Sequence, residues 1–316
     1  MSEKKIITVF GATGAQGGSL ARSILEDRDG PFAVRAVTRN VNSAAARALA
    51  AAGAEVVAAD VDDADAVARA MQGAYGAYCV TFFWAHLSPE RELAEARGMA
   101  SAAEASGVQH VVWSTLEDTR KRVPLDDARM PTLQSKYKVP HFDAKGEANG
   151  IFRELGVPTT LLNTSFYWDN LIHFGMGPKK GPDGKLAFTL PMADKKLPGI
   201  AAEDIGRCAL GIFQRGPELV GKEVGIAGEH LTGAQMAAAL TQALGQPVVY
   251  NAVSPAVYRG FGFPGADDLG NMFQFKADFE TLYCGNRPVA LSRELHPKLQ
   301  TFAQWLAANK ERIPLA

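Results

Sequence analysis

Three glycines near the start of the chain are spaced to hold a phosphate group. Gly11, Gly14 and Gly17 stand directly after the apolar run 6–10 and before a segment with helical periodicity. The first glycine permits a tight turn, the second lets the backbone approach phosphate oxygens, and the third lets a helix pack close to a strand. The first helical turn would then present its N–H groups and positive dipole end to an anion. This context predicts a pyrophosphate site for a dinucleotide.

The end of the second expected strand distinguishes between the two nicotinamide dinucleotides. An acidic residue at this place would bind the ribose 2′-hydroxyl of NAD and repel the 2′-phosphate of NADP. This chain has Thr38 and Arg39 there, and a guanidinium offers a phosphate both charge and a planar pair of donors. The sequence therefore predicts NADP(H) as the cofactor. The alternative is that Arg39 is a solvated loop charge.

Residues at the ends of the third and fourth expected strands could reach the adenine and the nicotinamide. Asp60 could accept a hydrogen bond from the adenine amino group, with Val61 against the ring. Alternatively, Asp60 is a helix N-cap residue, a role that also suits the acidic residues at 62 and 63. Thr81 ends the fourth strand, and the aromatic side chains after it could wall the nicotinamide or belong to the core. These aromatic residues are Phe82, Phe83 and Trp84.

A serine, a histidine and a lysine stand where a hydride-transfer enzyme would need proton chemistry. Ser114 ends the fifth expected strand, and His141 and Lys145 share one face of an expected helix. Histidine can act as a general acid toward a developing alkoxide, but the nearby Lys145 charge favours the neutral imidazole, which is the poorer donor. Lys145 and His141 are the candidate catalytic residues, and Lys145 would also hold the nicotinamide ribose. The alternative for His141 is a packed structural side chain.

A polar and aromatic run follows the sixth expected strand. Its residues are Tyr167, Trp168, Asp169 and Asn170. They would face the nicotinamide and a substrate, because the carboxyl ends of parallel strands meet at one edge of the sheet. The alternative is a hydrophobic hinge between two lobes. The histidines show no spacing typical of metal ligands, so no metal site is predicted.

The elements that must position these residues alternate between short apolar runs and helical patterns. Strands are expected at 6–10, 33–38, 54–60, 77–81, 110–114 and 159–163, and helices near 16–27, 42–52, 63–72, 89–106 and 141–155. This rhythm predicts right-handed crossovers and a parallel sheet, and continuous apolar runs indicate strands covered on both faces. The expected fold class is α/β: a Rossmann-type doubly wound parallel sheet with a smaller α/β C-terminal lobe.

The second half of the chain is less regular. Residues 170–200 are rich in Gly, Pro and Lys and predict irregular structure or a lid. Helices are expected near 203–215, 232–244, 254–260 and 265–280, with a short strand pair at 223–227 and 247–251. We predict a dinucleotide-binding domain at 1–160 and a smaller lobe at 161–316 for a substrate or a partner. The segment 200–228 is expected to pack back on the first domain.

Composition excludes several classes of protein. The chain has 316 residues, 47% hydrophobic residues and a formal net charge of −1. It can therefore bury a full core, and it has no basic stretch that would hold a nucleic acid. The three cysteines lie far apart, as in a reducing compartment, and no segment is typical of a signal peptide or a membrane span. We expect a cytoplasmic protein without direct nucleic-acid or membrane contacts.

Several motifs resemble those of NmrA-like proteins, an atypical branch of the short-chain dehydrogenase/reductase superfamily. The similar segments start at positions 9, 37, 141 and 262, and read Val-Phe-Gly-Ala-Thr-Gly-Ala-Gln-Gly-Gly, Val-Thr-Arg-Asn, His-Phe-Asp-Ala-Lys-Gly-Glu and Gly-Phe-Pro-Gly-Ala-Asp-Asp-Leu-Gly-Asn-Met-Phe. The resemblance is strongest to the redox-sensing members of the family. It covers nearly the whole chain, including the C-terminal lobe.

The resemblance implies a set of cofactor contacts. The phosphate loop would consist of Gly11, Ala12, Thr13, Gly14, Ala15 and Gln16. Arg39 and Ser43 would bind the 2′-phosphate, and Asp60 and Val61 would contact the adenine. The nicotinamide end would be contacted by Thr81, Phe82, Phe83, Lys145 and the run Tyr167 to Asn170. Two departures remove positive charge, because the sensors carry lysine where this chain has Ser43 and Ala94. The tyrosine that the superfamily places four residues before its lysine is also missing. Tyr137 lies before Pro140, which belongs in the first helical turn.

The missing tyrosine favours a regulator over an enzyme. The resemblance implies a protein that senses the NADPH/NADP⁺ balance, acts through a protein partner and forms a homodimer. The alternative is an NADPH-dependent reductase of a small aromatic or conjugated carbonyl, an imine or a quinone, because related reductases work with a lysine and no tyrosine. The family includes both kinds of protein, and fold alone does not decide between them.

Overall fold

The computed structural model describes residues 3–181 and 184–315, which form two compact units. The first unit takes its described residues from 1–118, 141–164 and 203–224, and the second from 119–140, 165–202 and 225–316. Both units are discontinuous, whereas the sequence placed a single boundary near residue 160. Most of the segment expected to pack back, 203–224, belongs to the first unit.

The first unit is built on a seven-stranded sheet with the strand order β11-β6-β5-β4-β1-β2-β3. Its strands are β1 (Lys5–Val9), β2 (Phe32–Thr38), β3 (Glu55–Ala58), β4 (Gly76–Cys79), β5 (His110–Thr115), β6 (Thr159–Asn163) and β11 (Glu223–Gly225). The pairings from β3 through β6 are all parallel. The strand order reverses between β1 and β4, as in a Rossmann sheet. The predicted fold class is confirmed, and each of the first six strands lies within a few residues of its expected range.

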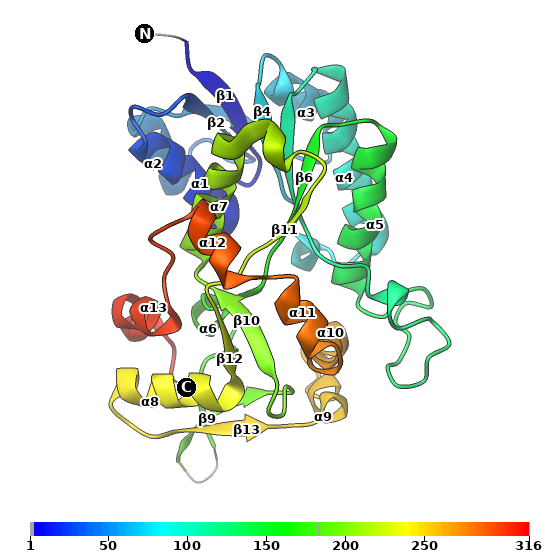
Figure 1. Ribbon diagram of the computed structural model, residues 1–316, viewed down its shortest axis with the longest axis vertical. Helices are drawn as coiled ribbons and strands as arrows, with labels where there is room; N and C mark the ends of the chain where they lie inside the picture. Colours follow the sequence, from blue (N-terminus) through cyan, green and yellow to red (C-terminus); the bar gives the residue numbers. More distant parts are fainter. Residues whose placement is uncertain (1–2, 182–183, 316) are drawn as a thin grey trace. The chain divides into compact units, whose positions relative to one another are not determined.

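Helices cover both faces of this sheet (Figure 1). They are α1 (Ala15–Glu26), α2 (Ala44–Ala51), α3 (Ala64–Met71), α4 (Pro89–Ala105), α5 (Pro140–Glu154) and α7 (Ala202–Arg215). On one face α1 packs closely on α7, because a Cβ at Gly206 would lie 2.2 Å from the backbone nitrogen of Leu20. On the other face, a buried cluster that includes Met99, Trp113 and Phe152 joins the sheet to α3, α4 and α5.

The second unit contains two small sheets where the sequence predicted irregular structure. β10 (Lys196–Ile200) lies between β7 (Phe166–Tyr167) and β12 (Glu229–Thr232), and β9 (Leu186–Leu190) lies between β8 (Lys179–Lys180) and β13 (Val248–Ala252). The expectation of a lid-like irregular segment at 170–200 is therefore wrong for much of its described part. Alternate residues of β9 are buried, a period-two signal that the surrounding glycines and lysines obscured. Positions 182–183 of this segment lie outside the described residues.

The predicted pairing of 223–227 with 247–251 is also wrong. β11 joins the seven-stranded sheet beside β6, and β13 pairs in parallel with β9. Each of the two strands pairs instead with a segment distant in sequence.

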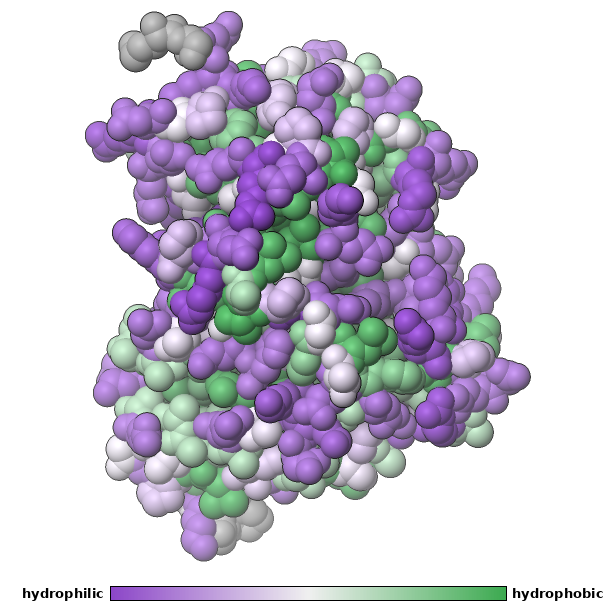
Figure 2. Space-filling view, viewed as in Figure 1, coloured by the Kyte–Doolittle hydropathy of each residue, from purple (hydrophilic) through white to green (hydrophobic). Residues whose placement is uncertain are grey.

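Helices and aromatic side chains complete the second unit. They are α6 (Asn170–His173), α8 (Gly233–Leu244), α9 (Pro255–Arg259), α10 (Ala266–Asp278), α11 (Glu280–Gly285), α12 (Val289–Leu295) and α13 (Phe302–Asn309). Those expected near 232–244, 254–260 and 265–280 are confirmed as α8, α9 and α10. In the described part of the chain, no helix combines the length and apolar character that a membrane crossing requires. Figure 2 shows hydrophilic residues spread over one face, interrupted by small apolar patches.

Candidate functional site

The glycine turn leads from β1 directly into α1. Gly11 has a φ of +63°, a left-handed conformation that costs glycine little. A Cβ at Gly17 would lie 2.5 Å from the Gly11 carbonyl oxygen and 2.6 Å from that of Phe10, so a larger residue would push α1 away from the turn. α1 begins at Gly14 without a side-chain cap, and Thr13 to Ala15 are exposed. The turn is therefore a cradle whose helix end is open to an anion.

Gln16 connects the phosphate loop to two neighbouring strands. Its Oε1 accepts hydrogen bonds from the Tyr78 hydroxyl and, at 2.7 Å, from the Ser114 hydroxyl. Ser114 stood at the expected position for a catalytic serine, but here its hydroxyl positions the loop. The remaining predicted loop residue, Ala12, is buried, and its N–H bonds the Val37 carbonyl across to β2 at 3.2 Å.

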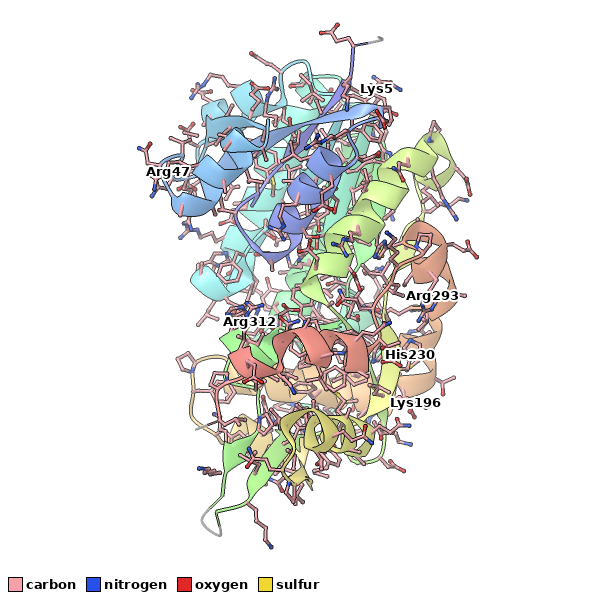
Figure 3. The ribbon with its side chains drawn as sticks, turned by 90° about the vertical axis from the view of Figure 1, so that its left-hand side faces the viewer. Lys5, Arg47, Lys196, His230, Arg293 and Arg312 are labelled. Carbon is pink, nitrogen blue, oxygen red and sulfur yellow. The ribbon has the colours of Figure 1, made fainter. Side chains whose placement is uncertain are left out.

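Arg39 lies exposed just beyond the carboxyl end of β2. Among the described residues, no hydrogen bond or ion pair involves its guanidinium, so its charge is available to a ligand. Ser43, the other predicted 2′-phosphate contact, caps α2 by accepting a hydrogen bond from the Ala46 N–H at 3.2 Å. Sequence reasoning passed over Arg47, an exposed cation one turn further along α2 (Figure 3).

Two acidic residues after β3 have different roles. Asp63 is the N-cap of α3 and accepts from the Ala66 N–H at 3.0 Å. Asp60 is exposed and accepts from the Asp62 N–H at 3.3 Å in a local turn. Because Asp63 fills the cap position, the adenine role proposed for Asp60 stays open. Val61 is half-buried beside the hydrophobic cluster.

Lys145 is held in a buried ion pair. Its Nζ lies 2.7 Å from Glu92 Oε1 and 2.6 Å from Thr81 Oγ1, and the Thr81 hydroxyl donates to the same glutamate. The Lys145 side chain is 11% exposed and that of Glu92 is fully buried. Sequence reasoning missed Glu92, since nothing in the local pattern of α4 separates it from the neighbouring surface glutamates. Thr81, two residues after β4, and Lys145, on α5, are thus in direct contact.

His141 is packed among aromatic rings. α5 begins at Pro140, as predicted, so Tyr137 lies outside the helix. The His141 ring centroid lies 4.8 Å from that of Trp84 and 5.9 Å from that of Phe83, and the residue is 5% exposed. Phe83 is equally buried, whereas Phe82 is 57% exposed. Of the two aromatic contacts predicted for the nicotinamide, Phe82 is accessible and Phe83 supports His141.

A second polar group lies on the far side of Glu92. His86 Nε2 is 3.6 Å from Glu92 Oε2 and 3.6 Å from Glu95 Oε1, and these three ligand-type atoms lie within 4.8 Å of one another. Burial and the neighbouring charge of Glu92 raise the pKa of Glu95 to about 7. Burial lowers the pKa of His86. The sequence predicted no metal site, and its test for paired histidines could not detect a cluster assembled by folding.

The raised pKa of Glu95 predicts a pH-dependent stability. Between its ordinary value of 4.5 and about 7 the native state holds a proton that the unfolded state releases. Stability should therefore fall as pH rises through this window, by on the order of 3 kcal/mol. Urea unfolding of the wild type and of Glu95→Gln at pH 5 and pH 8 measures this effect. The variant should lose most of the pH dependence, and an equal slope in both proteins would contradict the burial argument.

The aromatic run after β6 belongs to the second unit. Trp168 is 1% exposed and packs against Phe302 and Trp305, with ring centroids 5.3 Å and 6.4 Å away. Asp169 Oδ2 accepts from the Ala202 N–H at 2.8 Å. Tyr167 and Asn170 are half-buried. The indole is thus a core side chain of the second unit, and Tyr167 and Asn170 are the more accessible members of the run.

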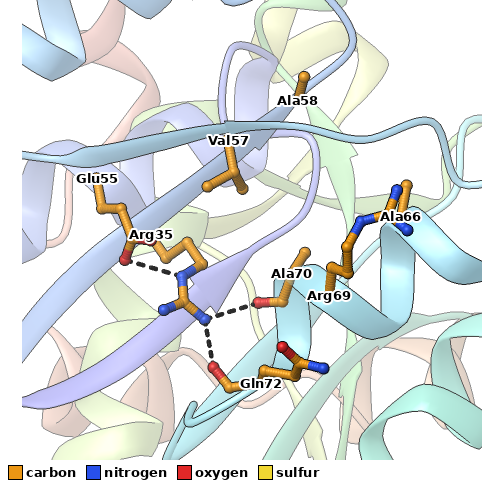
Figure 4. A pocket seen from close by; sticks show the side chains of 8 residues that line it. All are labelled: Arg35, Glu55, Val57, Ala58, Ala66, Arg69, Ala70 and Gln72. Carbon is orange, nitrogen blue, oxygen red and sulfur yellow. Dashed lines mark hydrogen bonds and ion pairs between the residues drawn. The ribbon is translucent and has the colours of Figure 1, made fainter.

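An open pocket lies beside the amino end of β3 and the C-terminal end of α3 (Figure 4). Arg35 Nε donates to Glu55 Oε2 at 2.8 Å, and its Nη1 donates to the carbonyls of Ala70 and Gln72 at 3.0 Å and 2.7 Å. These bonds satisfy carbonyls at the end of α3. The pocket follows β3 to its last residue, Ala58, and the hydrogen bonds of Arg35 in it are structural.

Comparison with known proteins places the chain in a family. The model of the NmrA-like family matches residues 3–306. The chain belongs to the NmrA-like family. It is 31% identical over 293 residues to the NmrA-like family domain-containing oxidoreductase FrzB of Cladobotryum sp, covering 85% of this chain and 83% of the relative. It is 30% identical over 320 residues to the oxidoreductase cpsB of Aspergillus campestris, covering 95% and 90%.

Solved NmrA-like structures share the fold. NmrA, a negative transcriptional regulator in complex with NADP, matches with a TM-score of 0.78 at 24% identity, covering 97% of this chain and 95% of that one. An NADPH-dependent quinone oxidoreductase from Escherichia coli complexed with NADPH matches with a TM-score of 0.71 at 23% identity, covering 96% and 98%. The fold thus hosts both a regulator and an enzyme, so the site must decide between them.

Proposed function

We propose that this NmrA-like protein binds NADP(H) and acts as an NADPH-dependent reductase of a small aromatic or conjugated carbonyl, an imine or a quinone. The observation that carries the proposal is the buried Lys145–Glu92 pair at the carboxyl strand ends. An ammonium held at this place by a fully buried carboxylate is a proton donor of fixed position. The sequence alone favoured the regulator, because the missing tyrosine was visible and the partner of Lys145 was not.

The residues present fit a dinucleotide. The glycine cradle from Gly11 to Gly17 accepts a group that approaches the backbone closely, and the uncapped start of α1 offers N–H groups to its phosphates. Arg39 supplies an uncommitted charge for a 2′-phosphate. Asp60 would bind the adenine, and Thr81, the exposed Phe82 and Lys145 would bind the nicotinamide end. Two structures with a similar fold are complexes with NADP and NADPH, which supports this assignment.

The chemistry divides between cofactor and protein. When bound, NADPH would supply the hydride. Lys145 would donate a proton to the oxygen or nitrogen atom of the substrate that becomes negative. Glu92 and Thr81 hold the Lys145 Nζ in a fixed position for this transfer. His141, packed against Trp84 and Phe83, would shape the pocket and leave the proton transfer to Lys145.

The names of the curated relatives support a reductase over a protein that has the fold without an enzymatic activity. Both relatives described above carry the name oxidoreductase. A regulator that senses the NADPH/NADP⁺ ratio through a protein partner is the second candidate. The packing of His141 at the position of the superfamily tyrosine favours it, because no hydroxyl donor replaces that tyrosine. A regulator requires that NADPH and NADP⁺ stabilise different conformations or assemblies. The expected homodimer and cytoplasmic location stay predictions.

The deciding experiment is turnover by the purified protein. NADPH absorbance is followed with a panel of quinones, enones, aromatic aldehydes and imines, and the copurified nucleotide is identified by mass spectrometry. Light scattering with NADPH or NADP⁺ measures assembly on the same samples. Steady NADPH oxidation with one acceptor class supports the reductase. Tight binding without oxidation, together with a nucleotide-dependent change of assembly, would support the regulator instead.

Arg39→Ala should weaken NADPH binding more than NADH binding. A charged bidentate contact contributes roughly 1.5–3 kcal/mol, which corresponds to about a tenfold or greater rise in the Kd for NADPH. Titration calorimetry with both nucleotides measures the difference. Arg28→Ala, which removes an exposed arginine beyond the far end of α1, is the matched control. Equal weakening of both nucleotides would show that Arg39 does not read the 2′-phosphate.

A further inference from the structure

A buried polar group connects the Lys145–Glu92 pair to the surface of the first unit. His86 follows β4, and Glu92 and Glu95 lie three residues apart on one face of α4. Glu92 uses its Oε1 toward Lys145 and turns its Oε2 toward His86. Glu95 Oε1 lies 3.6 Å from the same imidazole nitrogen.

Two atoms in this group are buried without a hydrogen-bond partner among the described residues. They are His86 Nε2 and Glu92 Oε2, on side chains that are 6% and 0% exposed. Buried polar atoms are rarely left unsatisfied. The 3.6 Å separations of His86 Nε2 from each carboxylate are too long for direct hydrogen bonds and suit a single bridging water.

The tautomer of His86 favours a water over a metal ion. The Ser88 N–H donates to His86 Nδ1 at 3.0 Å, so Nδ1 is an acceptor and the proton of the neutral ring lies on Nε2. A metal ligand would need a bare Nε2 and a proton on Nδ1, where it would meet the Ser88 N–H. An Nε2–H flanked by two carboxylates is instead arranged to orient a water between them.

We infer that Glu95 supplies protons to Lys145 through a water held by His86, Glu92 and Glu95 itself. The inference rests on the proposed reductase function. In each cycle Lys145 loses one proton to the reduced substrate. The O–H bond of Glu95 then breaks and an N–H bond of Lys145 forms. The bridging water accepts one proton and releases another to Glu92 Oε2. The Glu92 carboxyl turns about its terminal bond, releases that proton toward Lys145 and returns to its starting form. Solvent restores the proton on Glu95.

The charges around Glu95 agree with this direction. Its facing groups are Glu92 and Arg91 on α4, Asp62 after β3, His86 after β4 and Lys145 on α5. Arg91 is 51% exposed, lies 3.4 Å from Glu95 Oε1 and also pairs with Asp62, so the Glu95 end is the solvent end. Because its pKa lies near neutrality, Glu95 can both hold and release a proton under ordinary conditions.

The test compares Glu95→Gln with the wild type and with Glu90→Gln, an exposed glutamate on the same helix. With NADPH and menadione, Glu95→Gln should lower kcat on the order of tenfold and lose the inflection of kcat near pH 7. Added imidazole should restore part of the rate by carrying protons. The Kd for NADPH should be unchanged, because Glu95 acts through Lys145. An active wild type whose kcat and pH profile survive Glu95→Gln would overturn the proton path and leave the reductase standing.

An infrared titration tests the path without turnover. The carbonyl stretch of a protonated carboxyl should titrate near pH 7 in the wild type and vanish in Glu95→Gln. Lys145→Met should shift this titration upward, because a positive charge coupled to Glu95 is lost. If the wild type binds NADPH but reduces no acceptor, the reductase proposal fails. The infrared titration of Lys145→Met then tests the connection without turnover. An upward shift of the Glu95 titration supports the connection to Lys145, and an unchanged titration overturns it.

Discussion

Lys145→Met is expected to lower kcat for the best acceptor by at least about 100-fold, the usual contribution of a positioned proton donor. The methionine is unbranched and only one atom shorter than lysine, but it lacks the ammonium, which lies 2.7 Å from Glu92 and 2.6 Å from Thr81. The Kd for NADPH should rise less than kcat falls, because the phosphate and adenine contacts remain. Stopped-flow reduction at saturating NADPH measures the step directly.

The control for Lys145→Met is Lys136→Met, which removes an exposed lysine and should leave both constants unchanged. Circular dichroism and thermal unfolding verify that each variant is folded. A folded Lys145→Met protein that keeps its wild-type kcat would rule out Lys145 as the donor. The regulator would then be the better-supported function.

Glu92→Gln is expected to destabilise the protein by about 3 kcal/mol or more, because it leaves the buried Lys145 ammonium without a counter-charge. The Glu92 side chain is fully buried, so bulk solvent cannot compensate for the lost charge. The double variant Glu92→Gln/Lys145→Met should recover much of this loss, since it removes both charges. Urea unfolding of the two single variants and the double variant gives a coupling energy, which we expect to be on the order of 2–3 kcal/mol.

A surface pair provides the comparison for this cycle. Arg22 and Glu203 also form an ion pair, but their side chains are 49% and 33% exposed. Their coupling should be below about 1 kcal/mol. If the buried and exposed pairs couple equally, burial does not strengthen the Lys145–Glu92 interaction, and the ammonium is not held as we propose.

The parts of the site that sequence predicted are local. The turn from Gly11 to Gly17 depends on backbone conformation within a few residues, so glycine spacing after an apolar strand was sufficient to predict it. The same holds for Arg39, because an arginine directly after β2 must lie at the carboxyl edge of a parallel sheet. The first six strands were predictable because each contains a short apolar run between helical patterns, although no residue of β3 is fully buried.

Where prediction failed, the partner lies far away in sequence. Strands β11 and β13 were expected to pair with each other, yet each joins a different sheet. Trp168 was expected at the nicotinamide and instead packs against Trp305 near the C-terminus. An aromatic side chain packs against other rings that folding places next to it. The local sequence pattern does not show which distant residues these will be.

The Rossmann sheet and the glycine turn follow from short-range backbone geometry, so they could be read from the sequence, and the predicted preference for a 2′-phosphate rests on one charge at a strand end. The tertiary structure decided how Lys145 is used. Glu92, Glu95 and His86 resemble ordinary helix and loop residues until folding buries them beside α5. Burial strengthens the charge interactions among these side chains and raises the pKa of Glu95, because low-dielectric surroundings penalise every charge that lacks a partner.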